Sequence, residues 1–406
     1  MTNTAYSRIA RRLDAVRPSP TLAITARAAE LKAAGIDVLS FSAGEPDFPT
    51  PEHICAAARR AIDEGFTKYT AVGGIPELRK AIATNIETRF GVRYGPAEIA
   101  VTVGAKHALF NVAYALYEPG DEIVIPAPYW VTYPEHARLA GADPVVVPTA
   151  AENRFKMRPA DLERALGPRT RAVILSTPSN PTGAAYDERE LAALAEVLAP
   201  TSALVVTDEI YASLTYGGFR HRSFVSVAPQ MKDRVLLVDG VSKSYAMTGW
   251  RIGWVAGPRH FIEAILTVQS QATSNPTSIA QRAALEALVA PQDCVEEMRR
   301  RFEVRRDLML EGLLAIPGVR CLAPDGAFYV FPDFSEVIAK LDPAARIGND
   351  TELAAYFLEE ARVAVVPGEA FGAPGHLRLS YATGEATIRE GLDRMRKSLQ
   401  KIHPAG

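Results

Sequence analysis

Residues 234–254 read RVLLVDGVSKSYAMTGWRIGW, and this stretch decides the fold. Its apolar run, residues 235–238, shows no alternation of apolar and polar side chains, which predicts a strand buried on both faces of a parallel sheet. Lys243 follows, between Ser242 and Ser244, where the strand meets a loop. An amine in a partly apolar pocket has its charged form disfavoured, and the neutral amine condenses with aldehydes. An isolated lysine at a strand end is usually a surface residue, so its neighbours decide its role.

Arg251 lies eight residues after this lysine, within the sequence Gly-Trp-Arg-Ile-Gly. The flanking glycines let backbone approach closely, and a guanidinium offers a planar fork to a phosphate. The segment SKSYAMTGWRIG resembles the cofactor-lysine signature of the fold-type I, class I aminotransferases, which hold pyridoxal 5'-phosphate (PLP) as an aldimine on the lysine. The resemblance implies that Lys243 carries PLP, that Arg251 grips its phosphate, and that Ser242 belongs to the same cofactor site.

The composition fits a large globular protein that acts on small molecules. With 406 residues, 48% hydrophobic and 23% charged, we expect two domains or one large domain with appended segments. A formal net charge of -2 and no long Lys/Arg block argue against nucleic acid or anionic membrane as partners. Neither a signal-peptide core nor a run of about 18 apolar residues occurs, so we expect a cytoplasmic protein. Three scattered cysteines favour a reduced protein without a metal site.

Strand-like and helix-like segments alternate through most of the chain. We expect strands at residues 38–41, 99–103, 122–125, 145–147, 172–175, 204–206 and 235–238, and helices at 21–34, 51–65, 75–91, 159–166 and 188–198, with a further helix ending at 117. This alternation predicts an α/β fold, a mostly parallel sheet flanked by helices, with ligands at the carboxyl ends of the strands.

The pattern changes after Trp254. Helices are expected at residues 259–271, 278–289 and 292–314, then strands at 320–322, 327–331, 364–366 and 377–380, and a closing helix at 387–402. The shift predicts a domain crossing near residue 295. We therefore expect residues 1–45 to form an N-terminal arm and part of a small domain, 46–295 a large PLP-binding domain, and 296–406 a smaller α+β domain.

Two strand ends carry groups suited to the phosphate and the ring of the cofactor. Gly104 and Ala105 start a helix directly after a strand, and such a start offers backbone N–H groups and partial positive charge to a phosphate. One glycine alone is weak evidence, but it supplies a second anchor beside Arg251. Trp130 ends another strand, where a flat ring can stack on a planar cofactor, although tryptophan is more often a core residue. The family places an aromatic residue over the pyridine ring.

Two further strand ends carry polar motifs, SNPTG with Asn180 and DEIY with Asp208 and Tyr211. By themselves they read equally well as a turn and a helix cap. A carboxylate against the pyridine nitrogen keeps that nitrogen protonated and makes the ring an electron sink. The resemblance assigns this role to Asp208, and it assigns hydrogen bonds to the phenolic oxygen to Asn180 and Tyr211.

Substrate binding is implied by Arg378, in the apolar strand RLSY, since a buried arginine is costly unless paired. In the family this arginine clamps the substrate α-carboxylate, which the backbone at Gly44, in GEPDF, also meets. The resemblance also implies that Trp130 and Asn180 contact the substrate. The alternative for Arg378 is a structural ion pair.

A dicarboxylic substrate needs a second cation. The family uses a lysine in a G-[GA]-K turn, and Lys106 stands at the matching position, with Arg17 as a helper. The alternatives for Lys106 are that it binds the phosphate or is solvated. Tyr69 lies in a loop, where a tyrosine is usually a packing residue. By resemblance it reaches the cofactor phosphate of the neighbouring subunit, which implies a homodimer with shared active sites.

The resemblance extends from PSPTLA near the N-terminus to RLSYAT near the C-terminus. It is nearest to bacterial aspartate aminotransferases of the Iγ type, some of which also act on prephenate. It implies ping-pong transamination through the Lys243 aldimine, with the freed lysine as base. The amino acid would be aspartate or glutamate, with prephenate/arogenate left open, and the acceptor a 2-oxo acid such as 2-oxoglutarate or oxaloacetate. Three alternatives remain: another side-chain specificity, a carbon-sulfur lyase on the same scaffold, and a PLP-binding regulator, for whose DNA-binding module no residues are left.

Overall fold

A seven-stranded sheet forms the centre of the molecule. The computed structural model describes residues 9–18 and 20–402. The strands lie in the order β2 (Ile99–Thr102), β8 (Gly253–Ala256), β7 (Val235–Gly240), β6 (Leu204–Asp208), β5 (Thr170–Ser176), β3 (Glu122–Ala127) and β4 (Asp143–Pro148). All neighbours pair in parallel except β8, which is antiparallel to both β2 and β7. This confirms the predicted α/β fold with a mostly parallel sheet.

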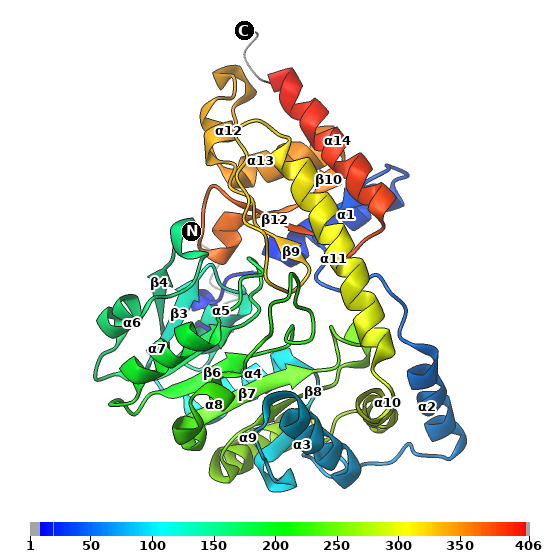
Figure 1. The fold of residues 1–406 in the computed structure, drawn as a ribbon, viewed down its shortest axis with the longest axis vertical. Helices are drawn as coiled ribbons and strands as arrows, with labels where there is room; N and C mark the ends of the chain where they lie inside the picture. Colours follow the sequence, from blue (N-terminus) through cyan, green and yellow to red (C-terminus); the bar gives the residue numbers. More distant parts are fainter. Residues whose placement is uncertain (1–8, 19, 403–406) are drawn as a thin grey trace, which may run out of the picture.

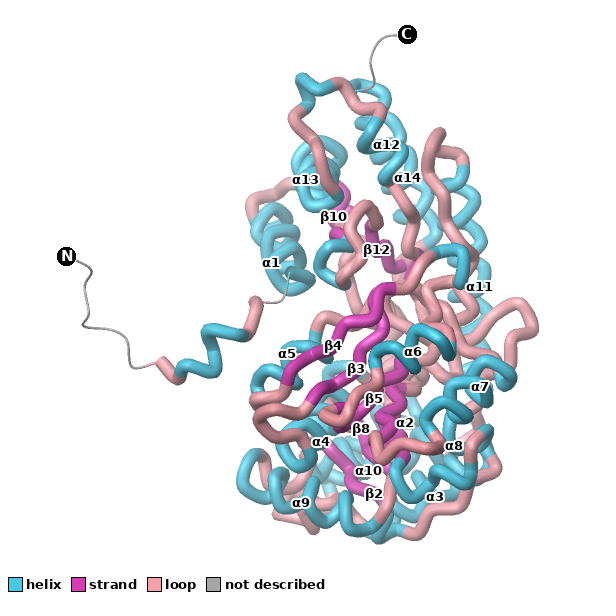
Figure 2. Tube along the Cα trace, turned by 90° about the vertical axis from the view of Figure 1, so that its left-hand side faces the viewer, coloured by secondary structure: helices cyan, strands magenta, loops and turns pink. Residues whose placement is uncertain are grey.

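Helices cover both faces of this sheet, as Figure 2 shows around the magenta strands. The α-helices of the described residues are α1 (Pro20–Ala33), α2 (Glu52–Asp63), α3 (Pro76–Phe90), α4 (Ala105–Leu116), α5 (Thr132–Leu139), α6 (Pro159–Ala165), α7 (Glu188–Leu198), α8 (Phe224–Val227), α9 (Arg259–Ala272), α10 (Ser278–Val289), α11 (Asp293–Leu314), α12 (Ser335–Ala339), α13 (Asp350–Tyr356) and α14 (Glu385–Ile402). Of these, α1, α12, α13 and α14 lie with the smaller body described below. In β7, Leu236 and Val238 pack with the α4 and α9 side, whereas Val235 and Leu237 pack with the α7 and α8 side. Because both faces are covered, the strand is apolar throughout, as the sequence predicted.

Two glycines bring the end of β7, the start of β8 and the start of α4 together. Gly240 pairs with Gly253 across the two strands. A Cβ added at Gly253 would lie 2.4 Å from the backbone nitrogen of Ala105, and one at Gly240 would lie 2.9 Å from the Cα of Gly253. Only residues without a side chain allow this approach. The lysine loop after β7 and the first turn of α4 are therefore fixed beside each other.

Four sequence expectations differ from the structure. Strand β8 was missed because its four residues carry no periodic signal. Helix α5 was missed because Pro134 suggests a break, yet proline is tolerated in a first turn, whose N–H groups lack intrahelical acceptors. The predicted strand at 320–322 is wrong, since Arg320 makes only an isolated bridge to Asp333. The strand expected at 364–366 is two short strands, β10 (Val363–Ala364) and β11 (Val366–Pro367).

A second, smaller body lies above the large sheet in Figure 1. Its strands are β1 (Leu39–Ser40), paired with β10, and the sheet β11-β12-β9 with β12 at Leu377–Ser380 and β9 at Tyr329–Val330. Helix α11, yellow in Figure 1, leads from the large sheet into it and begins at Asp293. The domain limits at 45 and 295 stay predictions. Residues 1–8 of the expected arm lie outside the described residues.

Candidate active site

The fold places one cavity of about 440 Å³ between the carboxyl edge of the large sheet and the smaller body. It contains eleven of the predicted site residues: Gly44, Ala105, Lys106, Trp130, Asn180, Asp208, Tyr211, Ser242, Lys243, Arg251 and Arg378. It also contains residues that the sequence did not single out: Thr25, Ser42, Ala43, Glu45, Val131, Tyr133, Ser176, Ile210, Thr248 and Tyr329. Residues far apart in the chain thus converge on a space large enough for a cofactor and a small substrate.

Lys243 lines this cavity. Its Nζ donates a hydrogen bond to the carbonyl oxygen of Gly44 at 2.6 Å, and the rings of Tyr211 and Phe328 lie 6.0 and 5.9 Å away. Burial lowers the pKa of Lys243 to about 8, against an opposing effect of the Glu45 carboxylate. A neutral, nucleophilic amine is therefore accessible near neutral pH.

Asp208, the last residue of β6, lies at the floor of the cavity and is 4% exposed. The hydroxyl of Tyr133 donates to its Oδ2 at 2.7 Å. Burial raises the pKa of Asp208 to about 6, while the bonds from Tyr133 and from the backbone of Ile210 act in the opposite direction. Above that pH the cavity offers a buried carboxylate that can face a cationic group. Tyr133 was missed in the sequence because its helix α5 was missed.

The cavity has an anion-binding end formed by Arg251 and the start of α4. Among residues 9–18 and 20–402, the guanidinium donates only to the backbone carbonyls of Thr248 at 2.9 Å and Val103 at 3.1 Å, so its charge is not neutralised by them. A Cβ added at Gly104, whose φ is +87°, would lie 2.5 Å from Nη2 of Arg251. Gly104 does not itself line the cavity. Because it has no side chain, the guanidinium of Arg251 can lie against the N-terminus of α4, and this combination suits a phosphate.

The opposite end is formed by Arg378, which is 2% exposed. Its Nη1 donates to Oδ1 of Asn180 at 3.0 Å and its Nη2 to the carbonyl of Ser42 at 2.8 Å, while Nε has no hydrogen-bond partner among the residues that the structure describes. The ring of Tyr329 lies 4.6 Å from the guanidinium carbon. Within the described part of the chain, no carboxylate forms a salt bridge with Arg378, so the structural ion pair considered above is not made there. A buried guanidinium without a counter-ion favours an anionic ligand.

Lys106 and Trp130 lie together in the cavity, with the lysine Nζ 4.8 Å from the indole ring centroid. Burial lowers the pKa of Lys106, and Arg251 lowers it further. The remaining predicted site residues lie elsewhere. Arg17 is exposed and outside the cavity lining, with its backbone N–H bonded to Glu135. Tyr69 is 91% exposed and does not reach the cavity of its own chain.

The phenol of Tyr211 shares a hydrogen bond of 3.0 Å with that of Tyr329. Burial raises the pKa of Tyr211 well above its ordinary value, so the hydroxyl keeps its proton and can donate. Tyr329 lies in the strand predicted at 327–331, but its role was missed because its place beside Tyr211 depends on a contact between residues 118 positions apart in the chain.

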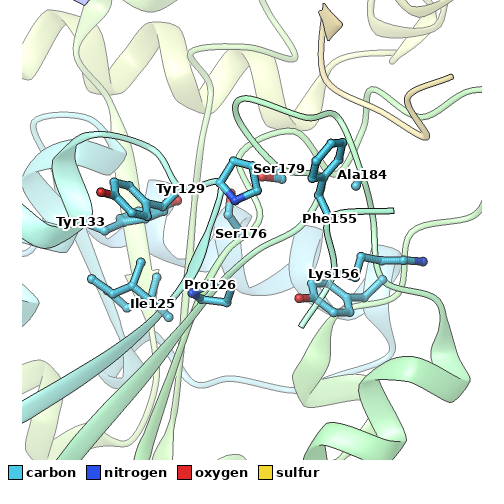
Figure 3. A pocket seen from close by; sticks show the side chains of 12 residues that line it. Ile125, Pro126, Tyr129, Tyr133, Phe155, Lys156, Ser176, Ser179 and Ala184 are labelled. Atoms are coloured by element: carbon cyan, nitrogen blue, oxygen red, sulfur yellow. The ribbon is translucent and has the colours of Figure 1, made fainter. Parts of the chain in front are cut away.

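A second, much smaller cavity adjoins the first and is drawn in Figure 3. Its volume of about 20 Å³ suits a single water molecule and excludes a substrate. Tyr133 and Ser176 line both cavities. This small cavity is lined in part by Tyr133, which bonds Asp208, and it is no separate ligand site.

Comparison with known proteins identifies the family. The sequence model of "Aminotransferase class I and II" matches residues 36–395. The chain is 49% identical to an aspartate aminotransferase of Geobacillus stearothermophilus, covering 98% of each chain. It is 50% identical to an aspartate/prephenate aminotransferase of Cereibacter sphaeroides, covering 94% of this chain and 96% of the relative.

Solved structures agree with these relatives. An aspartate aminotransferase from Rhizobium meliloti superposes with a TM-score of 0.94 at 46% identity, covering 97% of this chain and 99% of the other. The Thermus thermophilus aspartate aminotransferase with maleate gives a TM-score of 0.90 at 45% identity, covering 96% and 99%.

The family's cofactor is PLP, and the cavity fits it. PLP carries an aldehyde, a basic ring nitrogen and a phosphate, and the cavity offers an amine, a buried carboxylate and an unneutralised guanidinium beside a helix start. The match over nearly the whole sequence and the whole fold leads to one conclusion: the chain belongs to the class I and II aminotransferases, PLP-dependent transferases of fold type I.

Proposed function

We propose that this protein transfers the amino group of aspartate or glutamate to a 2-oxo acid such as 2-oxoglutarate or oxaloacetate, in a ping-pong cycle. The observation that carries the proposal is the cavity itself, in which Arg378 is buried without a carboxylate partner among the described residues, while Lys106 adds a second cation. Two cations suit a substrate with two carboxylates. Relatives named aspartate aminotransferase support the same substrate class.

The cofactor is proposed to be held by residues in and next to the cavity. Bound PLP supplies an aldehyde for the amine of the substrate and a ring that accepts the electron pair left when the α-proton departs. Asp208 holds the ring nitrogen in its charged form, and Tyr211 with Asn180 donates to the phenolic oxygen. Arg251 binds the phosphate together with the backbone of Gly104 and Ala105 and the hydroxyl of Ser242, and Trp130 covers the ring. Of these residues, Ala105, Trp130, Ser242 and Arg251 line the cavity, and Gly104 directly precedes Ala105.

Lys243 is the proposed catalytic residue. It would attach the cofactor covalently, and once released its Nζ would accept the proton of the substrate α carbon and deliver it to the cofactor's C4' carbon. Its lowered pKa, about 8, keeps a useful fraction of the neutral amine near neutral pH. The neighbouring carbonyl of Gly44, 2.6 Å away, fixes the amine at the mouth of the cavity.

The substrate is proposed to lie between two cations. Arg378 binds the α-carboxylate with its fork, sharing the site with Asn180 and the backbone at Gly44. Lys106 binds the distal carboxylate, and Arg17 assists from the rim. The Thermus thermophilus relative was solved with maleate, a dicarboxylate, which is consistent with a pocket of this charge.

A second substrate, prephenate, is favoured by one observation: a relative of 50% identity is named aspartate/prephenate aminotransferase. Prephenate also carries two carboxylates, so the same two cations suit it. We further propose a homodimer in which Tyr69 reaches the cofactor phosphate of the partner subunit. In the single chain this side chain is 91% exposed.

The test is a spectrum and a turnover panel. The purified protein with PLP is expected to be yellow, and Lys243→Ala is expected to lose transamination even if it still binds PLP. Amino acids, including glutamate, aspartate, phenylalanine and arginine, are paired with 2-oxo acids, prephenate among them, and the products are identified. Normal turnover by Lys243→Ala would refute the lysine assignment. Cystathionine is included for the lyase alternative: release of a thiol, pyruvate and ammonia from it in place of a new amino acid would indicate lyase chemistry. A preference for arginine would refute the acidic substrate.

A further inference from the structure

Glu45 is an acidic residue at the cavity that the assignments above leave without a role. The acidic residues that line the described cavity are Glu45 and Asp208. Asp208 lies at the floor, bonded to Tyr133, where it is proposed to face the ring nitrogen. Glu45 lies at the rim, in the loop that follows β1. A carboxylate there repels an acidic substrate, so Glu45 needs a role other than substrate binding.

The contacts of Glu45 tie it to the lysine loop. Its Oε2 accepts a hydrogen bond of 2.7 Å from the hydroxyl of Thr248, five residues after Lys243. The carbonyl of Thr248 in turn accepts from Arg251 at 2.9 Å. The residue before Glu45 is Gly44, whose carbonyl accepts the 2.6 Å hydrogen bond from Lys243 Nζ. One loop therefore holds both the acceptor of the lysine proton and a carboxylate next to it.

Without the Glu45 carboxylate, the surroundings of Lys243 would mainly disfavour its ammonium form. Burial and the guanidinium groups of Arg251 and Arg378 all lower the pKa of Lys243, whereas Glu45 and Asp208 raise it, Glu45 more strongly. The carboxylate also raises the pKa of Tyr329. The aromatic rings near the amine, Tyr211 and Phe328, lie about as far away as a weak cation–π contact allows, 6.0 and 5.9 Å. Glu45 is thus the main charge that favours the ammonium form.

We propose that Glu45 is a positioning residue for Lys243: its carboxylate, held by Thr248, favours the ammonium form of the lysine at the Gly44 carbonyl and keeps it in place between proton uptake and proton delivery. The inference rests on the proposed function and deepens it. When the substrate Cα–H bond breaks, the proton would move to Nζ, a new N–H bond would form there, and the electron pair would pass to the ring that accepts it. The lysine would then give the same proton to the cofactor's C4' carbon, so a carboxylate on the Gly44 loop would hold the carrier without consuming the proton.

The experiment measures the protonation of individual lysines in the cofactor-free chain. Trace acetylation with acetic anhydride is run at a series of pH values, and the labelled peptides of Lys243 and Lys106 are quantified by mass spectrometry. Glu45→Gln is expected to lower the pH midpoint of Lys243 labelling by roughly half a unit to one unit, a size set by a charge at a partly solvated rim. The midpoint of Lys106 should not move, since burial and Arg251 set its pKa.

Two further variants separate charge from loop position. Thr248→Val removes the bond that fixes Glu45 and should lower the Lys243 midpoint by a smaller amount. Asp47→Asn is the matched control, because Asp47 lies on the same loop but its Oδ1 pairs with Arg305 at 2.7 Å. This control should leave the Lys243 midpoint unchanged.

The outcomes are distinguishable. An unchanged midpoint in Glu45→Gln, or an equal shift in Asp47→Asn, would overturn the inference while leaving the lysine assignment intact. Failure of the proposed function would instead appear as PLP bound covalently to a lysine other than Lys243 in the wild-type chain, found by borohydride reduction and peptide mapping.

Discussion

At the residue scale, burial moves two pKa values towards each other. It lowers the pKa of Lys243 to about 8 and raises that of Asp208 to about 6, because each charged form loses water. Between these values both residues carry charge within one cavity. Asp208 binds a proton more tightly in the folded chain than in the unfolded chain, so its contribution to stability is present at low pH and is lost as the pH rises through about 6.

Tyr133 is expected to hold Asp208 in its charged form. Its hydroxyl donates to Oδ2 at 2.7 Å, and Tyr133→Phe removes this bond. A hydrogen bond to a charged group contributes about 1.5–3 kcal/mol, which corresponds to about one to two pH units. The pKa of Asp208 should therefore rise, and PLP binding by the cofactor-free variant should weaken below a higher pH than in the wild type. Absorbance titrations from pH 5 to 8 measure this shift.

Tyr129 provides the control for that substitution. It lies beside Tyr133 in the small cavity of Figure 3 but makes no hydrogen bond to Asp208. Tyr129→Phe should leave the acid midpoint of PLP binding where it is. An unshifted midpoint in Tyr133→Phe would mean that the phenol is only a packing group.

Lys106 is expected to decide between acidic and neutral substrates. A charged hydrogen bond to a partly buried carboxylate contributes about 1.5–3 kcal/mol. Lys106→Ser should therefore lower kcat/KM for aspartate by roughly 10- to 150-fold and spare aromatic amino acids, which have no distal charge. Steady-state kinetics on both substrate classes test this. An equal loss for both would assign Lys106 to the cofactor phosphate.

At the element scale, the contact of β7, β8 and α4 sets the geometry of the cofactor end. A Cβ at Gly253 would meet the backbone of Ala105 at 2.4 Å and of Gly104 at 2.6 Å, and backbone cannot yield as a flexible side chain does. Gly253→Ala should push α4 from the sheet, lowering stability by about 1–3 kcal/mol and weakening PLP binding. Thermal unfolding and PLP titration measure both effects.

Gly249 offers a control within the same sequence motif. A Cβ there meets nothing within 4 Å, so Gly249→Ala should change stability and PLP affinity little. Equal effects of Gly253→Ala and Gly249→Ala would contradict the view that close packing at β8 places the start of α4 beside Arg251.

At the scale of the whole molecule, Tyr69 connects the proposed active site to assembly. Mixing Lys243→Ala with an inactive Tyr69→Ala chain under subunit exchange should restore activity, because one site of each hybrid dimer receives both intact residues. Equal mixing gives hybrids in half of the dimers, so recovery of about a quarter of wild-type activity is expected. Mass spectrometry of intact dimers confirms exchange. No recovery among proven hybrids would argue that Tyr69 serves its own subunit or none.

No helix within the described residues is long and apolar enough to cross a membrane. The large sheet and the smaller body instead enclose a polar cavity, to which Gly44 and Arg378 are brought by β1 and β12 and Asp208 by β6. The site is thus a property of the assembled fold rather than of any one segment.

The sequence by itself determined the family, the α/β class and most elements with strong local signals. The helices at 188–198 and 278–289 match α7 and α10 residue for residue, because each has a clear helical pattern along consecutive residues. The lysine, the carboxylate and the arginines of the cavity were named from short motifs at strand ends. Their roles, like the domain limits, stay predictions.

Only the tertiary structure decided which side chains support these groups. Glu45 meets Thr248 across 203 residues of chain and Tyr133 meets Asp208 across 75, and such distant pairs leave no periodic mark in the sequence. The same reason explains the wrong strand at 320–322 and the missed strand β8. A strand is stabilised by the strands that pair with it, and β8 pairs with β2 and β7. Its first residue is Gly253 because the backbone at the start of α4 leaves no room for a side chain there.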